Sequence, residues 1–114
     1  MPDTGSAAPP TCPVEDALGL LRGKWRLMVL FRLRDGPMRF NALQRSLAPV
    51  TQKVLTATLR GLEDDRLVWR RSMGGVPPHV TYGLTEEAVG LDPVFDALAA
   101  WRMQKGRPDG RPSA

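Results

Sequence analysis

The stretch that most constrains the fold is residues 51–65, TQKVLTATLRGLEDD, because it predicts a short helix with two different faces. Thr51 is a favourable N-cap, since its hydroxyl can accept a hydrogen bond from a backbone N–H one turn later. Apolar residues recur at helical spacing and form one stripe, consisting of Val54 (or Leu55), Leu59 and Leu62. The opposite face carries side chains that can contact base edges and phosphates in a DNA major groove, namely Gln52, Lys53, Thr56 and Arg60. An ordinary amphipathic surface helix is the alternative.

The residues before this helix favour a helix-turn-helix. Residues 25–35, WRLMVLFRLRD, are apolar around most of a helix and predict a buried central helix that ends at a Gly-Pro pair. A short strand at residues 38–40 and a short helix over residues 41–47, capped by Asn41, are expected next. About three to four residues then separate the two helices, which is the spacing of a helix-turn-helix.

The residues after this helix favour a wing. Residues 67–72 and 80–84 predict two short strands around the turn sequence MGGVPP at residues 73–78. The alternative is a hairpin that only caps the core. Residues 14–21 predict a first helix, and Thr85 is expected to cap a last helix with a long apolar stripe. The expected fold is therefore mainly α with a small β-hairpin wing.

One domain accounts for the length of 114 residues. We expect disordered tails at residues 1–10 and 106–114, which are rich in proline, glycine and small or polar residues, and an ordered domain at residues 11–105. The single cysteine excludes an intrachain disulfide, and no apolar run approaches the length of about 20 residues that a membrane span needs. The N-terminus lacks the pattern of a signal peptide. We expect a cytoplasmic protein without membrane contact.

Positive charge is concentrated in the middle of the chain. The net charge is +4, yet residues 22–72 contain 12 basic and 4 acidic residues, whereas the rest of the chain contains 4 basic and 8 acidic residues. Of the 16 basic residues, 13 are arginines, which suit bidentate contacts with phosphate and guanine. An arginine-rich genome would explain the preference for arginine over lysine, but it would not explain this concentration of charge.

The sequence does not indicate enzymatic or metal chemistry. His79, the only histidine, has no partner at metal-ligand spacing, and the chain has neither a glycine-rich phosphate loop nor a paired nucleophile and base. We therefore expect no enzyme, no metal and no cofactor. The core is the expected place for Trp25, Met28, Phe31 and Phe40, although a small effector would fit the groove between the first helix, the central helix and a dimer partner.

Five segments together resemble the HxlR family of bacterial winged helix-turn-helix regulators. They are CPVEDALGLLRGKW (residues 12–25), LRDGPMRFNALQRSL (33–47), TQKVLTATLRGLEDDRLVWR (51–70), VPPHVTYGLTE (76–86) and LDPVFDALAAW (91–101). The resemblance implies a homodimer that binds operator DNA through the second helix of the motif and the wing. The chain departs from the family at Gly61, where a good helix former is usual, at the uncharged Gly74-Gly75 wing turn, and at Ala88, where glycine is frequent.

DNA contacts are expected from the second helix of the motif, the wing, and the start of the first helix of the motif. Arg39 and Asn41 lie where that first helix approaches the phosphate backbone, and Arg45 is a further candidate there. Arg70 and Arg71 alternate across their strand, so only one of them points fully towards DNA. The expected set is Arg39, Asn41, Thr51, Gln52, Lys53, Thr56, Ala57, Arg60, Arg70, Arg71 and His79.

A dimer interface is expected between the apolar faces of the first and last helices, formed by Val14, Leu18, Leu21, Leu91, Val94, Phe95, Leu98 and Trp101. The alternative is a monomer whose last helix folds back on its own core. Cys12 lies at or just before a helix N-terminus, where the dipole favours a thiolate. The resemblance adds that some HxlR regulators sense quinones, aldehydes or oxidants through a cysteine at this place, and an inert cysteine is the alternative.

These features predict a dimeric, sequence-specific DNA-binding transcription regulator, acting as a repressor or autoregulator on a palindromic operator. Its expected partners are double-stranded DNA, a second copy of the chain and a small electrophile or oxidant. Two alternatives remain open. A winged-helix protein-interaction module would not need a cationic face, and a nonspecific architectural DNA binder would have similar affinity for any sequence.

Overall fold

The structure is a computed structural model, and it describes residues 12–75 and 79–104. In chain order the elements are α1 (Pro13–Leu20), α2 (Lys24–Leu33), β1 (Met38–Arg39), α3 (Phe40–Ser46), α4 (Gln52–Asp64), β2 (Val68–Met73), β3 (His79–Leu84), α5 (Glu86–Val89) and α6 (Asp92–Gln104). The tails predicted at residues 1–10 and 106–114, and part of the predicted turn at residues 73–78, lie outside the described residues. None of the described helices is long and apolar enough to cross a membrane.

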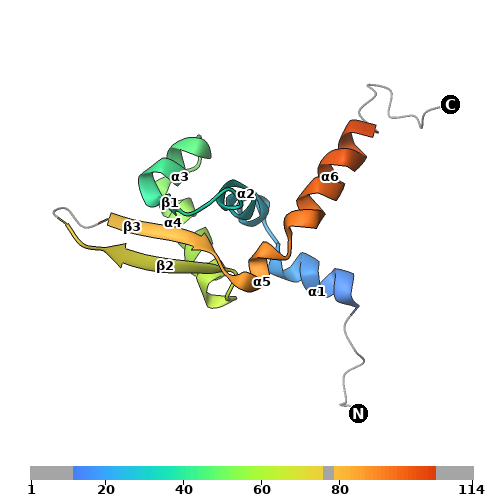
Figure 1. Cartoon of the computed structure of the whole chain (residues 1–114), viewed down its shortest axis with the longest axis horizontal. Coiled ribbons are helices and arrows are strands. Elements are labelled where there is room, and N and C mark those ends of the chain that lie inside the picture. The colour runs from blue at the N-terminus through green and yellow to red at the C-terminus, as the bar shows by residue number, and fades with distance from the viewer. Residues whose placement is uncertain (1–11, 76–78, 105–114) are drawn as a thin grey trace, which may run out of the picture.

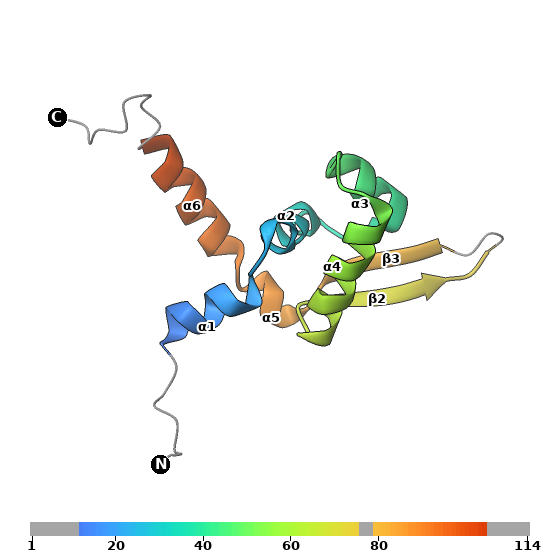
Figure 2. The same cartoon turned by 180° about the vertical axis from the view of Figure 1, so that it is seen from behind.

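The molecule has two different ends. The hairpin of β2 and β3 projects from one side of the body, whereas α1 and α6 diverge from the opposite side (Figure 1). Seen from behind, α4 lies across the hairpin, with α2 and α3 beside it (Figure 2). The fold is therefore mainly helical with a small sheet, as the sequence predicts.

The sheet is antiparallel and has the strand order β1-β3-β2. Met38 of β1 pairs with Tyr82 of β3, and Arg70 of β2 pairs with the same tyrosine from the other side. In the hairpin, Trp69 lies opposite Gly83, and a Cβ atom at Gly83 would collide with the indole ring. Glycine at this position therefore lets the indole lie across the neighbouring strand.

The core forms where α2, α3, α4, the hairpin and α5 meet. Leucine and valine side chains supply most of it, and α4 contributes three residues that are at most 1% exposed. The buried cluster consists of Val29, Leu30, Leu33, Leu43, Leu47, Val50, Leu55, Leu59, Leu62, Leu67, Val68, Tyr82, Ala88 and Phe95. This cluster holds α4 firmly against the body through one face and leaves its other face in solvent.

Two local expectations are wrong. The central helix α2 is not buried on most of its surface, because Met28 is 38% and Phe31 39% exposed on the side towards α6. Asn41 does not cap α3, because the extended backbone of β1 runs into the helix and makes Arg39 the N-cap. Phe40 then starts the helix, with its ring 6.4 Å from that of Tyr82.

The last helix is also not continuous. Thr85 caps only the short helix α5, where its hydroxyl accepts a hydrogen bond from the N–H of Ala88 at 3.3 Å. A new helix, α6, begins at Asp92 and carries most of the predicted apolar stripe. Pro93 explains the break, because proline lacks an N–H and its ring would clash with a carbonyl four residues earlier in an uninterrupted helix.

The end of α4 is tightly defined. Arg66 adopts the left-handed conformation with a φ of 62°, and the N–H of Leu67 donates back to the carbonyl of Leu62 at 2.9 Å. This is the hydrogen bond that closes a Schellman motif, in which a left-handed residue ends the helix. The carbonyl of Arg66 also accepts a hydrogen bond from the hydroxyl of Thr85 at 2.7 Å. The end of α4 is thereby tied to the start of α5.

Candidate nucleic-acid interface

The helix α4 is positioned by its first residue and its buried stripe. The hydroxyl of Thr51 accepts a hydrogen bond from the N–H of Val54 at 3.1 Å, as expected for an N-cap. The buried stripe contains Leu55, Leu59 and Leu62, whereas Val54 is 40% exposed. Of the two residues that could start the predicted stripe, Leu55 is the one that does so.

The outward face of α4 is lined by the side chains that the helical spacing predicts. One open hollow is formed by five residues of this face, Gln52, Lys53, Thr56, Ala57 and Arg60. Four of them are exposed and Thr56 is half-buried. The helix thus presents two cations, two hydrogen-bonding side chains and a methyl group, a set that can contact the phosphates and base edges of a duplex.

A second hollow, of about 530 Å³, joins α4 to α3 and to the strand β3. Its basic side chains are Arg39 at the N-cap of α3, Arg45, and His79 at the start of β3. Other residues of its wall are Phe40, Asn41, Ala42, Gln52, Thr56, Val80 and Tyr82. The structure therefore brings three separate stretches of sequence, around residues 40, 52 and 79, to one place.

The hairpin separates its two predicted arginines. Arg70 lines a third hollow together with Thr56 and Arg60 of α4, so it lies on the helix side of the sheet. Arg71 lies over the ring of Trp69 at 4.9 Å and belongs to the other face of the strand. Of the two wing arginines, only Arg70 joins the surface that α4 presents.

The cations of this surface make no ion pair with a carboxylate of the described residues. Among residues 12–75 and 79–104, the ion pairs with carboxylates involve Arg26 and Arg34, and none involves Arg39, Lys53, Arg60 or Arg70. The charges of this face are therefore available to an anionic partner. The same ranges contain no group of three or more His, Cys, Asp or Glu residues that could hold a metal ion.

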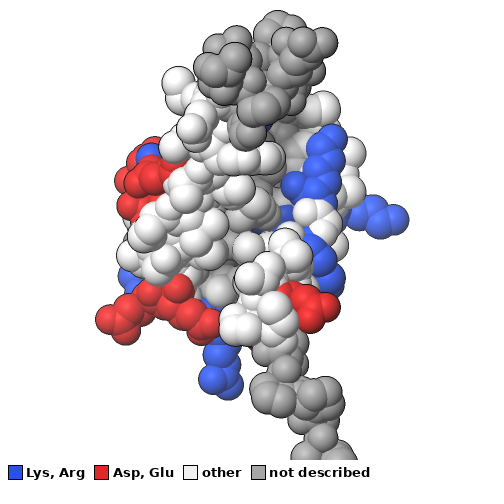
Figure 3. All heavy atoms as spheres, turned by 90° about the vertical axis from the view of Figure 1, so that its right-hand side faces the viewer, with Lys and Arg blue, Asp and Glu red and all other residues white. Residues whose placement is uncertain are grey.

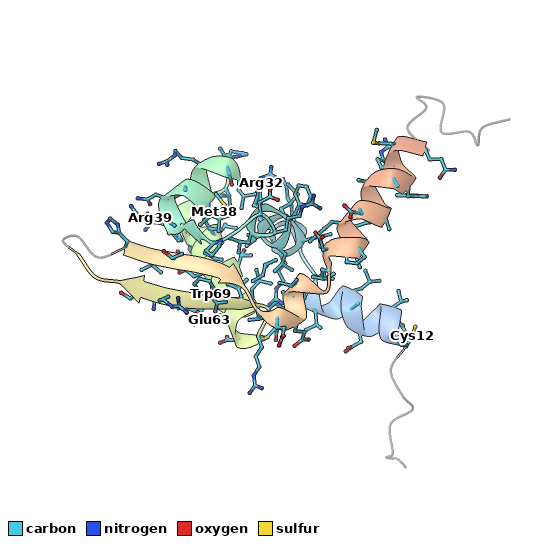
Figure 4. All side chains as sticks on the ribbon, in the orientation of Figure 1. Cys12, Arg32, Met38, Arg39, Glu63 and Trp69 are labelled. Carbon is cyan, nitrogen blue, oxygen red and sulfur yellow. The ribbon has the colours of Figure 1, made fainter. Side chains whose placement is uncertain are left out.

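Sequence reasoning missed two residues of this surface. Glu63 and Tyr82 line the hollow that contains Arg60 and Arg70. Figure 4 shows Glu63 close to the hairpin. Helical spacing could have found Glu63, because it follows Arg60 by three residues and therefore shares its face. Tyr82 has no comparable signal in the sequence, because its place depends on the register of β3.

The predicted dimer residues divide into exposed and internal ones. Exposed apolar side chains are Val14 (65%) and Leu18 (64%) on α1, and Val94 (42%), Leu98 (43%) and Trp101 (58%) on α6. Three others face the chain's own core: Leu21 and Leu91 are half-buried, and Phe95 is 5% exposed with its ring 5.3 Å from that of Phe31. The end view shows a broad surface without charge, bordered by both acidic and basic residues (Figure 3).

Cys12 is exposed and is the N-cap of α1. It lies at the outer end of α1, remote from the hairpin (Figure 4). Its carbonyl accepts the hydrogen bond from the N–H of Asp16 at 2.9 Å, which begins the helix. The cysteine is thus accessible to solution reagents but does not belong to the surface of α4 and the wing.

Several known transcriptional regulators are similar to this chain in sequence. A transcriptional regulator of the helix-turn-helix type from Methanothermobacter thermautotrophicus is 42% identical over 95 residues, which are 83% of this chain and 72% of that protein. The regulator YdeP of Bacillus subtilis is 41% identical over 90 residues, covering 79% of this chain and 70% of its own length.

Solved structures of regulators are also similar to this chain. The reduced form of the transcriptional regulator YodB from B. subtilis matches with a TM-score of 0.75 and 34% identity, covering 87% of this chain and 98% of that one. The redox regulator HypR in its oxidized form matches with a TM-score of 0.74 and 39% identity, covering 81% and 95%.

The family itself follows from the sequence model of the HxlR-like helix-turn-helix, which matches residues 20–109. This match includes the helix-turn-helix of α3 and α4, the hairpin and α6. The proteins of this kind are transcriptional regulators and not enzymes. The chain therefore belongs to the HxlR-like helix-turn-helix family of DNA-binding transcriptional regulators.

Proposed function

We propose that the protein is a dimeric, sequence-specific repressor or autoregulator that binds a palindromic operator. The observation that carries this proposal is the series of adjoining hollows along α4, the start of α3 and the hairpin. Gln52, Thr56 and Arg60 supply groups for base edges, and Arg39, Lys53 and Arg70 supply charges for phosphates. In this proposal α4 is the recognition helix and the hairpin is the wing.

The exposed apolar side chains of α1 and α6 support the dimer. A contiguous apolar patch of this kind on a small protein usually marks an interaction surface. A second copy is the partner that a two-fold palindromic site requires, because a symmetric dimer places two recognition helices one DNA turn, or a multiple of it, apart. The two recognition helices then contact equivalent half-sites.

Control by oxidants or electrophiles through Cys12 is the finer part of the proposal. It is supported by the exposure of Cys12 at the N-cap of α1 and by the similarity to HypR, a redox regulator. Because the chain has one cysteine, an oxidised form needs an intersubunit disulfide, an adduct or a small-thiol cap. Cys12 is not among the residues that line the hollows of α4 and the wing, so its effect on DNA binding would be indirect.

Fluorescence anisotropy on the intergenic DNA beside the protein's own gene tests the function. A scrambled duplex of equal length is the control, and both are titrated at several salt concentrations. We expect a preference of about a thousandfold for the operator and a steep loss of affinity with salt. Equal affinity for both duplexes would indicate an architectural binder, and no binding at low salt would indicate a protein-interaction module.

The role of Cys12 is tested in the same assay with quinone and aldehyde treatment. The wild-type protein should change its operator affinity after treatment, and Cys12→Ser should not. Mass spectrometry of the treated protein identifies the adduct or the cross-linked dimer. An equal response of both proteins would show that Cys12 is not the sensor.

A further inference from the structure

Arg26 joins three helices through one guanidinium group. Its side chain is 11% exposed and extends from α2. The Nη1 atom donates to the carbonyl of Leu20, the last residue of α1, at 2.9 Å, and to the Oδ2 atom of Asp65, the C-cap of α4, at 2.6 Å. One side chain therefore connects the end of α1 to the end of α4, the proposed recognition helix.

The C-terminal end of α4 is acidic and lies against a cation from α2. Three acidic residues lie there, Glu63, Asp64 and Asp65, and the last turn contains no basic residue. The C-terminus of a helix carries partial negative charge, which makes carboxylates unfavourable and cations favourable at that place. Arg26 supplies a cation there, and its hydrogen bond, with a smaller contribution from the charge of Arg22, holds the pKa of Asp65 below the ordinary value of 3.8.

A glycine in the middle of α4 makes room for this contact. A Cβ atom at Gly61 would lie 2.5 Å from the Nη2 atom of Arg26, so the end of the arginine side chain would have to shift. Glycine costs helix stability of about 1 kcal/mol relative to alanine. Its presence at a position where the family usually has a helix former is explained by the guanidinium group that lies against it.

Apart from this contact, α1 is attached at its C-terminal end, where Leu20 and the following Leu21 are partly buried against the core. None of the residues of α1 is buried, and the link to α2 passes through Gly23, which has a φ of 85°. We propose that Arg26 is a positioning residue that sets the angle between α1 and the recognition helix. In the dimer, this angle sets the distance between the two recognition helices and thus the half-site spacing that the protein prefers. The inference rests on the proposed function, because it requires a dimer on a two-part operator.

Operators with altered spacing test the consequence for DNA. Inserting or deleting one base pair between the half-sites moves one half-site by about 3.4 Å and rotates it by about a tenth of a turn. The wild-type protein should prefer the native spacing by about tenfold, comparable to one unfavourable base-pair change. Arg26→Met and Asp65→Asn should each reduce this preference to about twofold. Asp64→Asn is the control for Asp65→Asn, because it makes the same charge change on an exposed neighbour, and it should keep the preference.

The ratio of affinities separates positioning from charge. Arg26→Met and Asp65→Asn change the net charge in opposite directions, so they change nonspecific affinity in opposite directions as well. Both should nevertheless lower the spacing preference. If both variants remained folded dimers with the wild-type preference, the inference would be wrong.

A measurement without DNA keeps the inference testable if the proposed function fails. Nitroxide labels on Cys12 and on Ala57→Cys report the distance between α1 and α4 by double electron–electron resonance. Dilution with unlabelled protein restricts the signal to pairs within one chain. A narrow distance distribution that becomes broad in Arg26→Met, but not in Asp64→Asn, would support positioning. Equal widths would overturn the inference, whereas absence of operator binding by the wild type would overturn only the proposed function.

Discussion

Two helices of equal length show how differently the two ends of the molecule are built. Both α4 and α6 have 13 residues and an apolar stripe. In α4 the stripe of Leu55, Leu59 and Leu62 is at most 1% exposed. In α6 only Phe95 is buried, and Leu98 and Trp101 remain 43% and 58% exposed.

The two helices differ in whether the rest of the chain covers their apolar stripes. The chain covers the stripe of α4 itself, so the helix is fixed and its polar face is left for a partner. The chain leaves most of the stripe of α6 uncovered, so the apolar face is the part left for a partner. One end is therefore built to meet a charged, hydrated surface, and the other to meet an apolar one.

The largest expected effect comes from a charge in the uncovered stripe. Trp101→Arg should convert the dimer to monomers and lower operator affinity by about 10²–10⁴, because two linked binding units lose their joint attachment. Light scattering measures the mass and anisotropy measures the affinity. Gln104→Arg places the same charge on an exposed polar residue of α6 and should behave as the wild type. A dimeric mass for Trp101→Arg would contradict the interface.

Matched truncations in the two stripes should separate core from interface. Leu59→Ala should lower the free energy of unfolding by about 2–5 kcal/mol, because it leaves a cavity. Leu98→Ala should cost about 1 kcal/mol or less in the single chain, since the side chain is 43% exposed. Urea unfolding at several protein concentrations distinguishes them, because only the Leu98 variant should weaken the concentration dependence of stability. Equal losses at all concentrations would contradict the contrast.

Lys53 tests whether the outward face of α4 contacts phosphates. Lys53→Gln should weaken binding to all DNA sequences and reduce the salt slope by about 1, as for the loss of one phosphate contact. Lys24→Gln is the matched control, because Lys24 lies over the ring of Trp25 at the start of α2. Titration by anisotropy at several salt concentrations measures both slopes. Equal slopes for the two variants would place Lys53 outside the DNA contact.

The smallest expected effect is a pH dependence of the stability that the contact between Arg26 and Asp65 contributes. Because the pKa of Asp65 is lowered in the folded protein, the contact with Arg26 stabilises the fold above the ordinary pKa of 3.8. That contribution is lost as the pH falls through the lowered pKa. The difference in unfolding free energy between wild type and Arg26→Met should therefore be constant near neutral pH and shrink in acid. A difference independent of pH would show that the charge of Asp65 plays no part.

The sequence predicts local features well where one residue or one period decides them. Thr51 caps α4 and the stripe beneath the helix is buried, because capping chemistry and helical spacing act over a few residues. The alternation of Arg70 and Arg71 similarly places them on opposite faces of one strand. The apolar spacing from Leu91 onward predicts one continuous last helix, and this prediction is wrong because α5 ends before Pro93 and α6 begins at Asp92.

Features that depend on distant parts of the chain could not be predicted in this way. The spacing of Phe95 is the same as that of Leu98, yet Phe95 packs against Phe31 while Leu98 stays exposed. The hollow between Arg39 and His79 depends on the strand register that brings β1 and β3 together. Periodicity shows that a face is apolar, but only the tertiary arrangement shows what lies against it.

Gly61 also links the substitutions that positions 26 and 61 can accept. While Arg26 is present, any side chain at position 61 meets its guanidinium group. A helix-forming residue introduced at 61 alone would therefore lose the benefit of its propensity. If a shorter residue replaces Arg26 first, position 61 can accept a helix former without this contact, and an arginine restored at position 26 would have to adopt another side-chain conformation. The effect of a substitution at position 61 therefore depends on the residue at position 26.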